Sequence, residues 1–172
     1  LLEGSLAVPG VELRVRDRFR LAERLVLRGD PDGARLLAQL AAAERGDDAR
    51  RYAFAASAAL PDAEAKRRMF ERFAGDAGLP EGWVEEALAP FNAPEHAVYT
   101  LPLLAPALAR LPELKRTRKI FFVERWLGAF LAGQADARAL EEVRRVLAGE
   151  LDADLRLKLL EAADGLQRSV AI

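Results

Sequence analysis

The chain has 172 residues, of which 51% are hydrophobic and 31% are charged, which excludes a disordered segment and gives no apolar run long enough for a membrane span. Its net charge of -1 argues against a general affinity for nucleic acids, and the absence of cysteine excludes disulfides and thiolate chemistry. A chain of this length hides about 70% of its unfolded surface, enough for one domain with a real core.

The first sixteen residues differ from the rest, because turn residues such as Pro9 and Gly10 stand among short alternating segments. This pattern predicts an extended lead-in or a hairpin over residues 1–16. From Asp17 onward apolar residues recur at helical spacing, so we expect a single helical domain over residues 17–172. The first helix is expected to end at Arg28, with Gly29 as its C-terminal cap.

Three further helices are expected over about 31–45, 47–60 and 62–73. Asp30 suits the cap of the first of these, and Pro31 suits its first position, where a missing N–H has no consequence. The helix over 47–60 presents mainly small residues on its inner face, which lets a neighbouring helix approach closely.

The middle of the chain predicts a short helix around Trp83 and then a loop over residues 91–96. Asn92 and Glu95 have the spacing of a capping box for the next helix. That helix contains Pro102 and Pro106, which predict a kink or a break. The only histidine lies in the loop, and we expect it to be solvated rather than a catalytic base or zinc ligand.

A long helix from Pro112 to about Ala132 has the widest apolar face and is expected to be the most buried. With Trp83, its expected core residues are Phe122, Val123, Trp126 and Phe130. Two more helices follow, over about 136–148 and 152–169. About nine helices with short loops predict an all-α fold of antiparallel helix pairs, either a bundle or an irregular HEAT/armadillo-like α-solenoid or superhelix, which we favour.

Motifs for nucleotide binding, serine nucleophiles and zinc peptidases are all absent from the sequence. Asp47 and Asp48 begin like the magnesium motif D-D-x-x-D, but residue 51 is arginine, so we interpret the pair as a helix start. We therefore expect no catalytic residue, no metal ligand and no cofactor in this chain.

A basic cluster precedes the aromatic pair at 121–122, and it consists of Arg110, Lys115, Arg116, Arg118 and Lys119. Such a cluster is most often the solvated face of a helix. Near a helix N-terminus it is unfavourable unless the side chains reach solvent or anions. The alternative is a positive surface that attracts peptide carboxylates, with Arg116 and Lys119 foremost among the residues that would line a cavity.

Several strings, in order, resemble the C-terminal helical domain of bacterial aminopeptidase N, a zinc metallopeptidase. Residues 115–127, K-R-T-R-K-I-F-F-V-E-R-W-L, are similar to that domain's long helix, and F-N-A-P-E-H at 91–96 is similar to its F-N-x-P loop. The other matching strings are Leu2-Glu3-Gly4 with Pro9-Gly10 near the start of the chain, Leu60-Pro61 with Ala65-Lys66, Leu79-Pro80 with Trp83, and the helix start at 151–158. Each string is a packing or capping signature, so the resemblance depends on their shared order.

The resemblance implies a non-catalytic domain that covers the active site of a parent aminopeptidase and restricts which peptides enter. The parent's single zinc would lie in an upstream catalytic domain, held by H-E-x-x-H and a further glutamate. The implied partners are that domain and peptide substrates, with no nucleic acid and no membrane, in the cytoplasm. The alternative is a free-standing helical-repeat scaffold that binds proteins; Leu1 in place of an initiator methionine favours the accessory domain.

Overall fold

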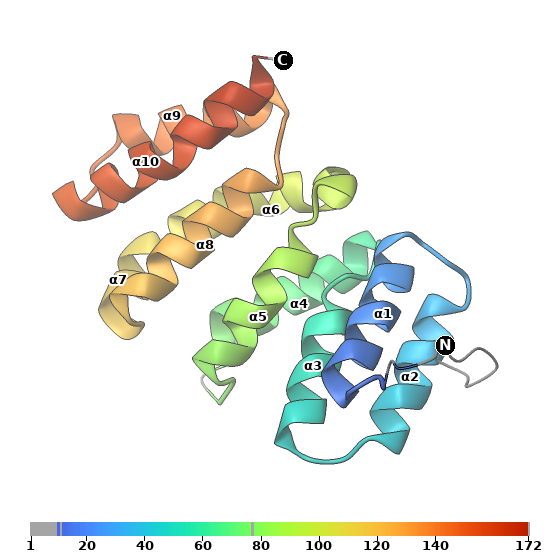
Figure 1. Ribbon diagram of the computed structural model, residues 1–172. Helices are drawn as coiled ribbons and strands as arrows, with labels where there is room; N and C mark the ends of the chain where they lie inside the picture. Colours follow the sequence, from blue (N-terminus) through green and yellow to red (C-terminus); the bar gives the residue numbers. More distant parts are fainter. Residues whose placement is uncertain (1–9, 11, 77, 172) are drawn as a thin grey trace.

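Apolar residues at three- and four-residue spacing produce an all-helical molecule, shown in Figure 1 as a computed structural model that describes residues 10, 12–76 and 78–171. These residues form ten α-helices and one 3-10 helix, without a strand. The helices are α1 (Val15–Leu27), α2 (Gly33–Ala43), α3 (Asp47–Ser57), α4 (Ala63–Gly75), α5 (Glu81–Phe91), η1 (Pro94–His96), α6 (Ala97–Ala109), α7 (Leu111–Thr117), α8 (Ile120–Ala132), α9 (Ala137–Ala148) and α10 (Ala153–Val170). The predicted all-α class is confirmed.

Successive helices alternate between two rows that advance from the N-terminus to the C-terminus (Figure 1). In one row α1, α3, α5, α8 and α10 each pack against the next, and in the other row α4, α6 and α9 do so. Helix α2 covers α1 and α3, and the short α7 packs beside α8. This arrangement of helix pairs is that of an irregular α-solenoid, as expected.

Several helix ends follow from capping residues that the sequence displays. The side chains of Asp62, Asp136 and Asp152 accept backbone N–H groups at the starts of α4, α9 and α10, at 2.7 to 3.0 Å. Gly29 has a positive φ of 66° just after α1, as its expected capping role requires. Helix α2, however, begins at Gly33 rather than Pro31, because Asp30 holds the preceding residues in a turn: its side chain accepts the Asp32 N–H and its carbonyl accepts the Gly33 N–H, both at 2.9 Å.

The expected long helix from 112 to 132 is wrong, because the chain breaks at Arg118 and Lys119 into α7 and α8. Both residues are extended, with ψ of 164° and 152°. The break lets α7 fold back beside α8, so that Leu111 and Leu114 join the same core as Trp126. One straight helix could not bring its own first turns against its middle. Because the expected helix is divided into α7 and α8, the chain has ten α-helices in its described part where about nine were expected.

The expected kink or break at Pro102 and Pro106 does not end α6, which is a single helix through both. The two prolines are four residues apart and therefore lie on the same side of the helix, which is exposed. The backbone groups that lose their hydrogen-bonding partner to a proline ring thus face the solvent side of α6, where water can replace the lost bonds.

The loop between α5 and α6 also differs from expectation. Asn92 is the C-terminal cap of α5, and its Nδ2 donates to the Leu88 carbonyl at 3.1 Å instead of forming a capping box with Glu95. His96 is buried, at 4% exposure, and its Nε2 donates to the Leu27 carbonyl at 2.8 Å. The prediction of a solvated histidine was therefore wrong, because the C-terminal end of α1 covers the loop.

The lead-in predicted over residues 1–16 overlaps α1, which begins at Val15. Residues 1–9 and 11 of that lead-in lie outside the described part of the chain. Across the part that the structure describes, each helix is too short or too polar to cross a membrane.

Candidate functional site

The helix break divides the basic cluster into parts with different surroundings. Lys115 and Arg116 lie in the last turn of α7, where the partial negative charge of the helix end favours cations. Arg118 and Lys119 form the extended link, and Lys119 is the N-cap of α8. The five charges therefore do not crowd one helix N-terminus, as the sequence suggested that they would.

Lys115 is a structural tie between α7 and α10. Its ammonium group contacts the carboxylate of Asp152, the N-cap of α10, and lies 3.5 Å from Asp154. The hydrogen bond to Asp152 raises the pKa of Lys115 and lowers the pKa of Asp152. Because its charge is already matched by two carboxylates, Lys115 has little left with which to attract a ligand.

Two other basic side chains are engaged as well. Arg110 donates to Glu113 at 2.8 Å, and the guanidinium of Arg118 lies 5.4 Å from the centre of the Phe122 ring. Both arginines line a small cleft of about 270 Å³ beside the end of α4, which also contains Asp76. This cleft therefore pairs its cations with acids or aromatic faces.

Arg116 is different, because it is exposed and has no ion pair with any residue in the described part of the chain. It lines a groove of about 850 Å³ between α7 and the turn that joins α9 to α10. The groove is mainly apolar, and its lining residues besides Arg116 are Pro112, Lys115, Gly149, Glu150, Leu151, Asp152, Leu155 and Arg156. We call it the α7 groove.

The groove's third cation, besides Lys115 and Arg116, binds backbone carbonyl groups. Arg156 donates to the carbonyl oxygens of Leu147 and Gly149, at 2.6 and 3.0 Å, and so closes the C-terminal end of α9. Arg116 is thus the groove's one cation without a partner among the described residues. An apolar surface beside one free guanidinium suits a ligand that combines an apolar group with a carboxylate.

Lys119, which the sequence ranked beside Arg116, lines neither of these two hollows. Its side chain is exposed, and its backbone N–H lies 3.4 Å from a carboxylate oxygen of Glu81. The structure therefore brings Lys115 and Arg116 to one groove and separates them from Arg118 and Lys119.

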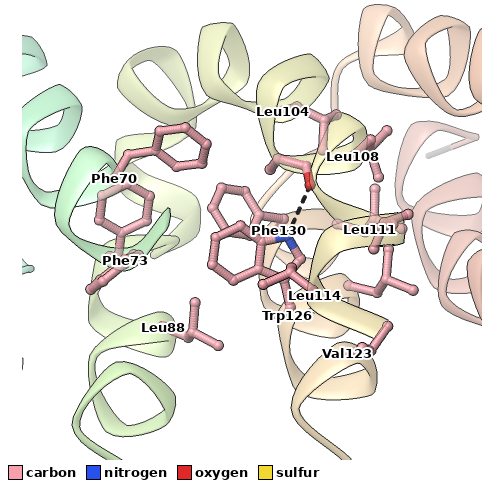
Figure 2. Close-up of a cluster of buried hydrophobic side chains, with 14 of the residues drawn as sticks. Phe70, Phe73, Leu88, Leu104, Leu108, Leu111, Leu114, Val123, Trp126 and Phe130 are labelled. Carbon is pink, nitrogen blue, oxygen red and sulfur yellow. Dashed lines mark hydrogen bonds between the residues drawn. The ribbon is translucent and has the colours of Figure 1, made fainter. Parts of the chain in front are cut away.

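Two of the predicted core residues, Val123 and Phe130, lie near the tryptophan of α8, Trp126, in the larger core (Figure 2). Phe122, Val123, Trp126 and Phe130 are all buried, and Trp83 packs partly buried against the same cluster. The indole N–H of Trp126 donates to the Ala107 carbonyl at 3.1 Å, shown by the dashed line. These side chains belong to one core that joins α4, α5, α6, α7 and α8.

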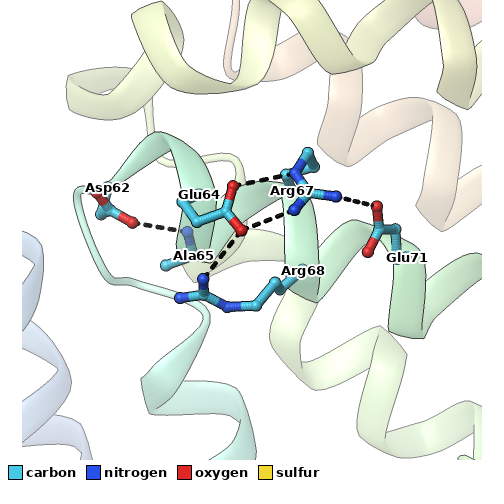
Figure 3. A network of polar contacts seen from close by, with 6 residues as sticks. All are labelled: Asp62, Glu64, Ala65, Arg67, Arg68 and Glu71. Carbon is cyan, nitrogen blue, oxygen red and sulfur yellow. Dashed lines mark hydrogen bonds and ion pairs between the residues drawn. The ribbon is translucent and has the colours of Figure 1, made fainter.

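Sequence reasoning missed Lys66, which has 1% exposure on the inner face of α4. The outer face of α4 carries a charged network in which Glu64 binds Arg67 and Arg68, and Arg67 also binds Glu71 (Figure 3). Lys66 is three and four residues before Met69 and Phe70, so its spacing from these buried residues was the signal for burial.

Clusters of three or more histidine, cysteine or acidic side chains suited to a metal ion are absent from the described residues. The chain matches no protein-family model and no curated protein sequence.

Proposed function

We propose that this chain is the non-catalytic C-terminal helical domain of a zinc aminopeptidase, and that it covers the parent's active site and restricts the entry of peptides. The proposal starts from the ordered resemblance of residues 60–66, 79–83, 91–96, 115–127 and 151–158 to that domain. A paired-helix array supplies the extended surface that such a cover requires.

The observation that supports this proposal most is the structural role of the residues that carry the resemblance. Lys66 joins three helices through carbonyl groups, Asn92 closes α5, His96 binds the end of α1, and Trp126 lies at the centre of the larger core. These four residues are buried and help to determine how the helix pairs fit together, whereas Lys115, Arg116 and Phe121 of the same strings are exposed.

In this proposal the α7 groove faces the space through which peptides pass. Pro112, Leu151 and Leu155 would contact an apolar side chain, while Arg116 attracts the carboxylate of the same peptide. The exposed position of Arg116 limits its contribution to about 0–1 kcal/mol, so its role would be to bias peptide entry.

The reading frame upstream of Leu1 tests the proposal directly. We expect it to encode H-E-x-x-H, followed by a further glutamate, within a catalytic domain in the same frame. A start codon directly before Leu1 would contradict the proposal and support the free-standing scaffold.

A measurement on the purified chain tests the non-catalytic part. The chain is expected to hydrolyse no aminoacyl p-nitroanilide and to contain no stoichiometric zinc by elemental analysis. One tightly bound zinc per chain, together with hydrolysis, would contradict it.

A further inference from the structure

Helix α1 carries three arginines at four-residue spacing, Arg16, Arg20 and Arg24, which we call the α1 arginine row. Residues four apart lie on one face of a helix, and all three are exposed. They line one groove of about 310 Å³, which is separate from the α7 groove. The other residues that line the 310 Å³ groove come from α1, α3 and α5, and they are Phe19, Glu23, Tyr52, Ala55, Glu86, Ala89 and Pro90. Three cations thus border a single hollow with an aromatic and aliphatic floor.

The side chains of the arginine row form no ion pair or hydrogen bond with any described residue. Two acids close to the row are engaged by other arginines, and these pairs are Asp17 with Arg14 and Glu86 with Arg51. The chain has 27 acidic residues, so the row is not unpaired for lack of carboxylates in the sequence.

One acid does face the groove without a salt bridge to any residue that the structure describes. Glu23 lies between Arg20 and Arg24 in sequence and is half-buried, and this burial raises its pKa. The charges around it are Arg20 and Arg24 on α1 and Glu86 on α5. Its single charge leaves the row with an excess of positive charge.

The row is unfavourable for the isolated helix. Like charges four residues apart repel each other, and Arg16 lies in the first turn, where the helix dipole is positive. A partner that supplied negative charge at the same spacing would relieve both effects.

We propose that the α1 arginine row and its groove bind an acidic segment of a partner polypeptide, with carboxylates about 6 Å apart. Four residues of helix advance about 6 Å, and alternate residues of an extended peptide lie about 6.4–6.8 Å apart on one side. A Glu-x-Glu-x-Glu segment therefore places one carboxylate at each guanidinium, which binds it through two parallel N–H groups.

A peptide suits this groove better than a nucleic acid does. The chain as a whole carries a net charge of -1, and Glu23 and Glu86 line the groove itself. A nucleic-acid strand places a phosphate near every nucleotide and favours surfaces with a broad basic excess, whereas a peptide supplies only as many carboxylates as the row can match. This inference does not depend on the proposed accessory role in an aminopeptidase.

Fluorescence anisotropy with a labelled peptide of alternating glutamate and alanine, E-A-E-A-E-A-E-A, tests the inference on the 172-residue chain. We expect saturable binding that weakens as salt is added, because exposed charges are screened. Each of Arg16→Gln, Arg20→Gln and Arg24→Gln should weaken binding about two- to threefold, and the triple variant about tenfold. Glu23→Gln should strengthen binding, because it removes the repelling carboxylate.

The matched control is Arg144→Gln on α9, since Arg144 is also exposed and without a partner among the described residues. This variant should bind the peptide as the unaltered chain does, and circular dichroism should show that all variants remain helical. The isomeric peptide E-E-E-E-A-A-A-A has the same charge, but it places at most two carboxylates at the alternate spacing on one side of the strand. It can match only two of the three arginines, so it should bind more weakly.

Three results would overturn the inference. They are the absence of binding by the alternating peptide at up to about 1 mM protein, equal binding by the triple variant, and equal binding of the two isomeric peptides. Tighter binding of a single-stranded oligonucleotide would assign the groove to nucleic acid instead.

Discussion

The Nζ atom of Lys66 donates a hydrogen bond of 2.7 Å to the carbonyl oxygen of Phe91, at the C-terminal end of α5. It also donates to the Ala58 carbonyl at 2.6 Å, at the end of α3, and lies 4.9 Å from the centre of the Phe91 ring. The buried amino group of one helix thus supplies hydrogen-bond donors to the C-terminal ends of two others.

Replacing Lys66 with methionine keeps an unbranched side chain, one atom shorter, and removes its donors. The carbonyl groups of Ala58 and Phe91 then lose their bonds to Lys66 in a buried place, so the free energy of unfolding should fall by about 1–3 kcal/mol. Urea unfolding measures the change. Lys119→Met, at an exposed position, is the control and should change little. A Lys66→Met protein as stable as the original would show that these bonds contribute nothing.

The stability of the chain should depend on pH through Lys66. Burial lowers its pKa from 10.5 to about 7, so between these values the unfolded chain binds a proton that the folded chain does not. The stability that Lys66 contributes therefore rises with pH from about 7 to 10.5, by at most about 1.4 kcal/mol per pH unit. The measurement is the unfolding free energy of the original protein and of Lys66→Met at several pH values across this range. If the difference between the two proteins stays the same at every pH, the prediction is wrong.

Gly133→Ala should destabilise the chain, although its φ of -76° is open to any residue. A Cβ there would lie 2.1 Å from the carbonyl oxygen of Asn92, so the loop must move, at a cost of about 1–3 kcal/mol. Gly128→Ala, on the exposed side of α8 with nothing near its Cβ, should raise stability by about 0.5–1 kcal/mol. If the melting temperatures of the Gly133→Ala and Gly128→Ala proteins change in the same direction, the close approach of Gly133 to Asn92 does not limit stability.

Trp126→Ala should lower the free energy of unfolding by about 3–5 kcal/mol, because the indole has 0% exposure at the centre of the larger core. The variant also removes one of the two donors to the Ala107 carbonyl, which keeps the backbone N–H of Arg110 at 3.3 Å. Phe121→Ala serves as the control, since Phe121 is 67% exposed and should matter by about 0.5 kcal/mol or less. Chemical denaturation of both variants checks the difference, and equal effects would place the tryptophan outside the core.

Under the proposed function, Arg116→Gln in the parent aminopeptidase should raise KM for peptides by up to about fivefold. The effect should shrink at high salt, with kcat for short chromogenic amides unchanged. Lys119→Gln is the matched control, because Lys119 is exposed but does not line the α7 groove. If neither KM responds to salt or substitution, Arg116 is only part of a solvated surface.

Most helices could be predicted because apolar spacing and caps such as Asp62 and Asp152 mark them locally. The break at Arg118 could not, since Leu111 and Phe122 are eleven residues apart, about three turns, and remain in phase on one continuous helix. The apolar pattern is therefore the same with or without the break. The α7 groove depends on this break. The sequence therefore could not predict that Arg116 lines the groove and Lys119 does not.

Burial of His96 could not be read locally either, because its partner Leu27 is 69 residues away. Lys66 was open to prediction from its spacing, but a lysine among apolar residues is usually at the edge of a helix face, where its ammonium group reaches water. Burial was decided by the carbonyl groups of Ala58 and Phe91, which only the packed helices bring together.

The bond between His96 and Leu27 also joins two separate hydrophobic clusters, a smaller one built mainly from α1, α2 and α3 and a larger one built mainly from α4 to α10. Burial and the charge of Lys66 lower the pKa of His96. As the pH falls, the unfolded chain therefore takes up a proton on this histidine more readily than the folded chain, and the contact between His96 and Leu27 becomes less stable. The end layer of a solenoid has neighbours on one side only, and it opens as a unit of its own. Amide hydrogens of α1 and α2 will therefore exchange with solvent before those of α8, and acidification will widen that difference.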